Sequence, residues 1–232
     1  MSEGFLLRVR YSITGRLAWL SHLETIRSME RVVRRARLPY AITEGFNPHM
    51  KISFGPALPV GAGSNGEYFD VRLREYLEPE QALEQLRAAA APNLMPEACA
   101  YVPVGSDAID VAYPVSVWEV AVTGGEGISP EESSMQLQTA FEKLLEQGYI
   151  TIEKKKGRRI VEKKVEFEGR LLEPPLVTFG QSGALVNFST FQGPAGALRA
   201  DKFVAEACKL AGEGFAWREI TRLELKPASE KQ

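Results

Sequence analysis

Two side chains in this sequence have the chemistry of a general acid or base near neutral pH. His22 and His49 are the only histidines, and both lie in one segment, residues 21–70. A neutral imidazole can take a proton from a ribose hydroxyl or donate a hydrogen bond to a phosphate. If the chain is an enzyme, its candidate catalytic residues are therefore His22 and His49. Histidines without a neighbouring nucleophile or metal set more often have a structural role, so we assign no catalytic residue.

Positively charged residues follow His22 at helical spacing. Guanidinium groups pair bidentately with phosphate oxygens, so an arginine face can follow a nucleic-acid backbone. A second basic run, KKKGRRIVEKK at residues 154–164, is predicted to form a hairpin that could enter a nucleic-acid groove. The alternative is that both are solvated surfaces, the helix face partly neutralised by Glu24 and Glu30 and the hairpin edge protected by lysines. The predicted nucleic-acid-binding residues are Arg27, Arg31, Arg34, Arg35, Lys51, Lys155, Arg158 and Arg159.

The turn GFNPH at residues 45–49 and a glycine-rich stretch, GAGSNG at residues 61–66, follow the basic helix. Asn47 precedes proline and is therefore held extended, and an aromatic side chain here could stack on a base. Consecutive amides of a glycine-rich loop can hold a phosphate, although such a loop alone is usually a simple turn. The residues predicted to shape a pocket are Tyr40, Phe46, Asn47, His49, Gly61, Gly63 and Glu67.

The composition argues against several classes of protein. The formal net charge is −2, and the apolar and charged fractions, 44% and 25%, are those of an ordinary soluble protein. No run approaches the roughly 20 apolar residues of a membrane helix, and the first residues resemble a strand more than a signal peptide. Cys99 and Cys208 are far apart, which favours a cytoplasmic protein without disulfides. Zinc-ligand, iron–sulfur, P-loop and dinucleotide-binding patterns are missing, so we predict no metal and no cofactor.

Hydrophobic periodicity predicts the elements that position these residues. In the first half we expect strands at residues 5–12, 40–43, 51–54, 67–73 and 95–104, with the glycine-rich stretch as a loop. Helices are expected at residues 21–38, after a capping box of Ser21 and Glu24, and at residues 79–91. The expected inward positions of the first helix are Leu23, Ile26, Met29 or Glu30, Val33 and Ala36.

The second half has the same kind of order. Strands are expected at residues 115–122, 149–155, 158–167, 176–179, 184–189 and 216–225, and helices at residues 130–147 and 200–211. The predicted fold is α+β, with two ferredoxin-like (split βαβ) domains whose antiparallel sheets are covered by helices. The domains are residues 1–108, with the SHLE helix and GFNPH turn, and residues 115–232, with the basic hairpin.

The segment from SHLETIRSMERVVRRARLPYAITEGFNPHM to KISFGPALPVGAGSNGEYFDVRL resembles the hallmark segment of the radical-SAM-linked family of domains of unknown function. The shared features are the serine-histidine-leucine helix start, the arginine-rich helix, the GFNPH turn and the proline-glycine loop that ends in glutamate. This resemblance implies a stand-alone, bacterial-type domain that works beside a cobalamin-binding radical SAM protein. A weaker similarity of element order is to CRISPR repeat-associated RNA-processing proteins, which typically carry their glycine-rich loop near the C-terminus.

Three functions are compatible with these features. The leading hypothesis is a non-catalytic RNA-binding or substrate-presenting accessory protein of a radical SAM enzyme in RNA modification. The alternatives are a metal-independent RNA endonuclease that uses a histidine general base, and a docking domain that contacts only the radical SAM partner.

Overall fold

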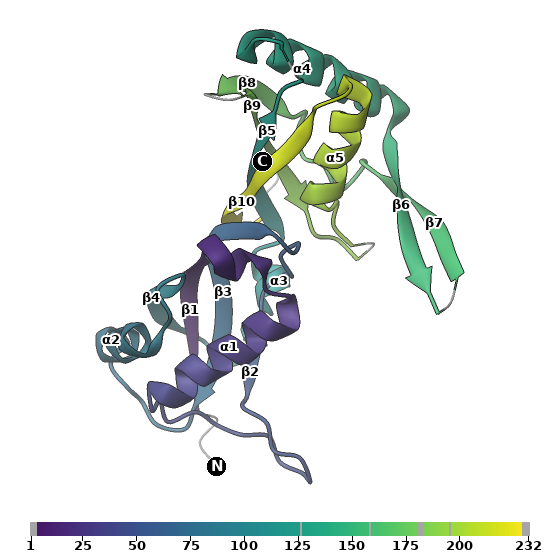
Figure 1. Cartoon of the computed structure of the whole chain (residues 1–232). Helices are drawn as coiled ribbons and strands as arrows, with labels where there is room; N and C mark the ends of the chain where they lie inside the picture. The colour runs from purple at the N-terminus through teal and green to yellow at the C-terminus, as the bar shows by residue number, and fades with distance from the viewer. Residues whose placement is uncertain (1–3, 126, 158, 181–182, 195, 229–232) are drawn as a thin grey trace. The chain divides into compact units, whose positions relative to one another are not determined.

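The computed structural model describes residues 4–125, 127–157, 159–180, 183–194 and 196–228. The chain forms two compact units, the first consisting of Met1–Tyr113 with Pro227–Gln232 and the second of Pro114–Lys226. Both units are mixed α+β with antiparallel strand pairing, as predicted, and each is described by itself below (Figure 1).

The first unit has one antiparallel sheet with two helices packed on one face. Strand β1 lies between β4 and β3, and β2 pairs with the other edge of β3. The elements in chain order are β1 (Phe5–Ile13), the 3-10 helix η1 (Gly15–Trp19), α1 (His22–Arg35), β2 (Ile52–Phe54), β3 (Ala62–Leu73), α2 (Pro79–Ala89), β4 (Leu94–Val102) and the short α3 (Ile109–Ala112).

Alternation along the strands builds the core of this unit. Leu7 and Val9 of β1 and Val71 of β3 are fully buried, and they belong to one cluster with Met29 of α1 and Leu86 of α2. The same sheet face therefore collects the apolar stripes of both helices.

The opposite sheet face holds the arginines of β1. Arg8 donates two hydrogen bonds of 2.8 Å to the carboxylate of Asp70 on β3 and a third, of 3.1 Å, to the carbonyl of Asp107. This pair is buried, and the hydrogen bonds that Arg8 donates to Asp70 raise the pKa of Arg8. Tyr113, which stacks on Tyr68 at 4.7 Å, lies beside the Arg8 guanidinium.

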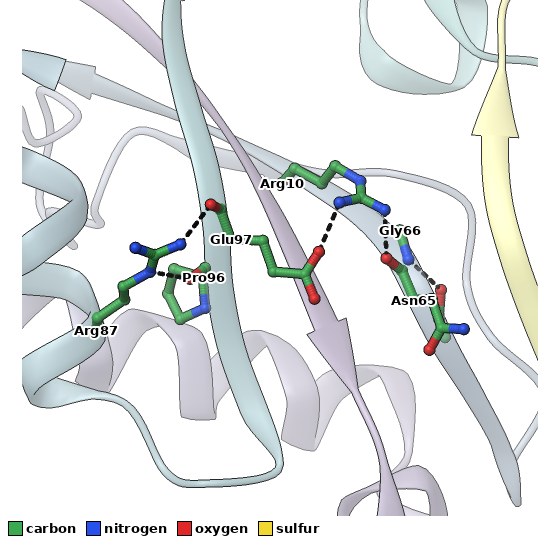
Figure 2. Close-up of polar contacts among 7 residues, drawn as sticks. Arg10, Asn65, Gly66, Arg87, Pro96 and Glu97 are labelled. Atoms are coloured by element: carbon green, nitrogen blue, oxygen red, sulfur yellow. Dashed lines mark hydrogen bonds and ion pairs between the residues drawn. The ribbon is translucent and has the colours of Figure 1, made fainter. Parts of the chain in front are cut away.

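Arg10, two residues further along β1, lies in a more open network (Figure 2). It donates to the carboxylate of Glu97 at 2.5 Å and to the carbonyl of Asn65 at 2.6 Å. Arg87 of α2 donates to the carbonyls of Pro96 and Glu97. The network therefore ties β1, β3, β4 and α2 together through charged side chains.

Three expectations for the first unit were wrong. The glycine-rich stretch is not a loop: β3 begins at Ala62 and pairs with β1 through a bulge at residues 65–66, which absorbs one extra residue between the Tyr11–Glu67 and Ile13–Ser64 pairs. Residues 40–43 make only isolated bridges, because their backbone groups are divided between β3 and the returning chain at Met50. Leu23 is 64% exposed, since the buried stripe of α1 runs through Thr25, Met29 and Val32 instead.

The second unit has the four-stranded order β10-β5-β9-β8, and each neighbouring pair is antiparallel. Its elements are β5 (Val115–Thr123), α4 (Pro130–Gln147), β6 (Tyr149–Lys156), β7 (Arg159–Glu166), β8 (Leu176–Gly180), β9 (Gly183–Phe191), α5 (Ala200–Ala211) and β10 (Ala216–Lys226). Strands β6 and β7 form a separate two-stranded hairpin that extends away from this sheet, confirming the predicted hairpin (Figure 1).

Aromatic packing defines the core of the second unit. The ring of Phe203 on α5 lies 5.2 Å from Phe141 on α4, 5.2 Å from Phe167 and 5.4 Å from Phe188 on β9. Ile150 and Val165 at the base of the hairpin are also buried. Phe203 thus joins α5 to α4, to β9 and to Phe167, which follows the hairpin, in one aromatic cluster.

Candidate functional site

Helix α1 begins where the sequence predicts, and its start sets the direction of the arginine face. The Ser21 hydroxyl accepts a hydrogen bond from the Glu24 amide, and the Glu24 carboxylate accepts bonds from the Ser21 amide and hydroxyl at 2.8 and 2.7 Å. These bonds from Ser21 lower the pKa of Glu24. The cap therefore fixes the first turn of the helix, with His22 at its first position.

The four predicted arginines of α1 are all exposed. Arg34 forms a salt bridge of 3.0 Å with Glu30, and the Arg31 Nε donates to the carbonyl of Arg27. Arg31 and Arg35 line a groove of about 190 Å³ together with Leu17 and residues at the end of α2 and the start of β4. The face is thus only partly neutralised, with Arg34 held in an ion pair within the helix itself.

Lys51 lies in a second basic groove, of about 360 Å³, at the end of β3. Arg72 and Arg74 line it too, with Gly4, Ala41, Leu73 and Val104. Continuing the register of β2 on β3 by one residue puts Lys51 directly across from Arg72, and the Arg72 amide donates to the Lys51 carbonyl at 2.9 Å. None of these seven lining residues is acidic.

Residues 42–50 form a projecting loop, which we call the finger (Figure 1). Its base is closed by the Ile42–Met50 bridge, by the Thr43 amide donating to the His49 carbonyl, and by the His49 amide donating to the Thr43 hydroxyl. Phe46 at its tip is fully exposed, with a relative accessibility of 106%. The finger returns directly to Lys51, so its base and the groove of Lys51 are continuous along the chain.

His22 lines a different, enclosed cavity of about 10 Å³, room for about one water molecule. Glu67 and Tyr11, both nearly fully buried, and Thr25 of α1 also line it. A carboxylate, a phenol and an imidazole therefore line the same cavity of the first unit. His49 is exposed on the finger and is not among the residues lining this cavity.

The residues predicted to shape one pocket are distributed over three places. Phe46, Asn47 and His49 belong to the finger, whereas Glu67 lines the cavity of His22. The other three lie against the sheet: Tyr40 packs on the core, Gly61 precedes β3 at φ +90° beside the Trp19 ring, and Gly63 is part of β3.

The hairpin presents its charges on two exposed strands of the second unit. Arg159 is exposed, and the Lys164 ammonium lies 4.2 Å from the centroid of the Tyr149 ring. The side chain of Lys155 and the whole of Arg158 lie outside the described residues.

Sequence reasoning missed Arg72 and Arg74 as site residues. Arg72 occupies an outward position in the alternating strand that ends at Leu73, and Lys51 lies on the predicted neighbouring strand. Two cations at the ends of adjacent strands were the available signal, but the pairing register needed to bring them together is a property of the fold.

Other chemistries find little support in the described residues. No group of three or more histidine, cysteine or acidic side chains among them is placed to hold a metal ion. Burial raises the pKa of the Cys99 thiol and raises that of Cys208 to about 12, so neither thiol is an activated nucleophile. Of the described helices, none has the length and apolar character needed to cross a bilayer.

These observations define an α+β protein of two antiparallel-sheet units whose first unit carries basic grooves and a projecting aromatic residue. The chain belongs to the family described as "Uncharacterized protein conserved in bacteria (DUF2344)", whose model matches residues 6–177. No protein of the curated collection matches it.

A chain of the solved structure titled "Crystal Structure of a Cbf5-Nop10-Gar1 Complex" is similar at 10% identity and a TM-score of 0.49. That alignment covers 95% of this chain and 48% of the other, so this protein spans about half the length of its structural neighbour. A likeness of this degree carries no information on function.

Proposed function

We propose that this protein is a non-catalytic RNA-binding or substrate-presenting accessory protein that works with a radical SAM enzyme in RNA modification. The observation that carries the RNA-binding part is a local excess of positive charge over residues 27–51, in a chain whose net charge is −2. Between Arg27 and Lys51 the sequence has six lysine or arginine residues and two glutamates. The four arginines of α1 are exposed, and so is Lys51 in its groove, so phosphates can reach them.

The radical SAM partner, a cobalamin-binding protein in this proposal, rests on the resemblance of the SHLE and GFNPH motifs alone. In that role the present chain would hold RNA while the partner supplies the radical chemistry. A cytoplasmic location is part of the same proposal, because RNA and a radical SAM enzyme are found there.

We also propose that both units are ferredoxin-like domains, residues 1–108 and 115–232. The support is their shared strand order: in each unit the first strand lies between the last strand and the third, counting without the β6–β7 hairpin. In this view the hairpin is an insertion into the second domain.

A second candidate function, a metal-independent RNA endonuclease, is favoured by one observation. His22 lines the same cavity as the buried carboxylate of Glu67, and a carboxylate can orient an imidazole that acts as general base. The enclosed cavity would have to open before a ribose could enter it.

One experiment separates the two candidates. The protein is incubated with a labelled structured RNA in EDTA, and the RNA is examined for both retention on the protein and cleavage. We expect the RNA to be bound and recovered intact. Products with cyclic phosphate ends that disappear in His22→Ala would establish the endonuclease, and RNA that is neither bound nor cut would overturn both proposals.

A further inference from the structure

We infer that the finger and the groove of Lys51 together bind a short segment of unpaired RNA, with a base stacked on Phe46 and the adjoining phosphates held by Lys51 and Arg74. This inference rests on the proposed RNA-binding function. The class of RNA is single-stranded RNA. The finger and the groove of Lys51 are the part of the first unit that distinguishes a single strand from a duplex.

The groove is suited to phosphate because of how its cations are arranged. Lys51 and Arg74 are both exposed, and both line the groove. None of the seven residues that line it is acidic. A phosphate bound there would accept hydrogen bonds from the ammonium of Lys51 and the guanidinium of Arg74 at the same time.

The finger is suited to a base because of where Phe46 lies. A phenylalanine that is fully exposed contributes nothing to the core, and water contact with its ring costs free energy that stacking would recover. The hydrogen bonds between Thr43 and His49 hold the two arms of the finger together behind it. The ring is thus presented on an ordered loop rather than on a free chain.

The two features lie within reach of one short strand. Phe46 is five residues from Lys51, a span of at most roughly 17 Å even for a fully extended chain. An aromatic platform next to a cationic groove is how proteins bind single strands, whose bases are free to stack. In a duplex the bases are already stacked on one another, so the ring would have no face to contact.

The test compares two RNAs of equal length, about twelve nucleotides, one without self-complementarity and one in a perfect duplex. Their affinities for the full chain are measured by fluorescence anisotropy. The variants are Phe46→Ala and the double variant Lys51→Gln/Arg74→Gln, whose residues are exposed and so replaceable without loss of the core. The matched controls are Phe179→Ala, another exposed phenylalanine, and Lys143→Gln/Lys202→Gln, two exposed lysines on the helices of the second unit.

We expect the unpaired RNA to bind more tightly than the duplex. Phe46→Ala should weaken binding of the unpaired RNA by roughly tenfold, the size expected for one lost base stack, and leave duplex binding unchanged. The double variant Lys51→Gln/Arg74→Gln should also weaken binding of the unpaired RNA, and by more than the control Lys143→Gln/Lys202→Gln does. Equal affinity for both RNAs, unaltered in Phe46→Ala, would overturn the inference and leave the proposed RNA binding standing. Binding of neither RNA would overturn the proposed function itself.

Discussion

Two carboxylates that accept hydrogen bonds from neighbouring arginines of β1 differ in burial. Asp70 and Arg8 have side-chain accessibilities of 5% and 9%, whereas Glu97 and Arg10 have 33% and 37%. A buried ion pair that loses one partner leaves an uncompensated charge, which is costly, while an exposed pair contributes little.

Replacing Asp70 by asparagine should therefore lower the free energy of unfolding by about 3 kcal/mol, because the Arg8 guanidinium would stay buried without its counter-charge. Glu97→Gln is the matched control and should cost less than about 1 kcal/mol. Urea unfolding followed by circular dichroism measures both. Similar losses in the two variants would mean that burial does not determine the contribution of the Arg8–Asp70 pair.

The residue patterns of the sequence predicted part of this arrangement. Alternation along residues 5–12 placed Arg8 and Arg10 on the face away from the core, as the structure confirms. The burial of Arg8 could not be predicted, because it depends on Asp70, Asp107 and Tyr113, which come from distant parts of the chain. The grouping of Lys51 with Arg72 and Arg74 depends on strand register in the same way.

At the scale of the element, the capping box of α1 makes a prediction about pH. The pKa of Glu24 in the folded chain lies below its unfolded value of 4.5, owing to the bonds from Ser21. Its contribution to stability is therefore fully present above pH 4.5 and is lost as the pH falls through the folded pKa.

Ser21→Ala should lower the free energy of unfolding by about 1 kcal/mol at neutral pH, the usual value of an N-cap. The difference from the wild type should become smaller as the pH falls below 4.5. Ser129→Ala on α4 is the control, since Ser129 caps that helix by accepting from the Glu132 amide, which does not titrate. Chemical denaturation at a series of pH values tests this. A Ser21→Ala deficit that is the same at all pH values would contradict it.

Element boundaries were predictable where local signals agreed. The capping box marked the start of α1, and the charged run around Gly157 predicted the β6–β7 hairpin. The end of α1 was predicted too late, because the helix stops at Arg35 and not directly before Pro39. The glycine-rich stretch was misjudged because glycine usually marks a loop, whereas here pairing with β1 continues across a bulge. The finger was predicted as a turn. That its residues do not line the cavity of His22 and Glu67 could not be predicted, because this cavity is formed where α1 and β3 come together.

At the scale of the whole molecule, the two units divide the predicted basic elements between them. The arginine face of α1, the groove of Lys51 and the finger belong to the first unit, and the hairpin belongs to the second. Strand and helix order in each half could be read from the sequence, because the hydrophobic period changes clearly from one element to the next. The sequence did not predict that His22 and Glu67 line one cavity, or that His49 is not among the residues that line it.

The measurement that tests the account most directly is the salt dependence of RNA binding. Phosphate contacts release counterions, so log K should fall linearly with log salt over about 0.05–0.3 M, by roughly 0.7 for each contact to a single strand. In the triple variant Arg27→Gln/Arg31→Gln/Arg35→Gln this slope should become shallower by about 2. Glutamine has nearly the helix propensity of arginine, so α1 should remain folded.

The matched control replaces Lys143, Lys202 and Lys209, exposed lysines on the helices of the second unit, by glutamine. The account predicts that this control keeps the wild-type slope while the α1 variant loses part of it. RNA binding that does not depend on salt, or an equal change of slope in both triple variants, would contradict the claim that the arginine face of α1 contacts RNA phosphates.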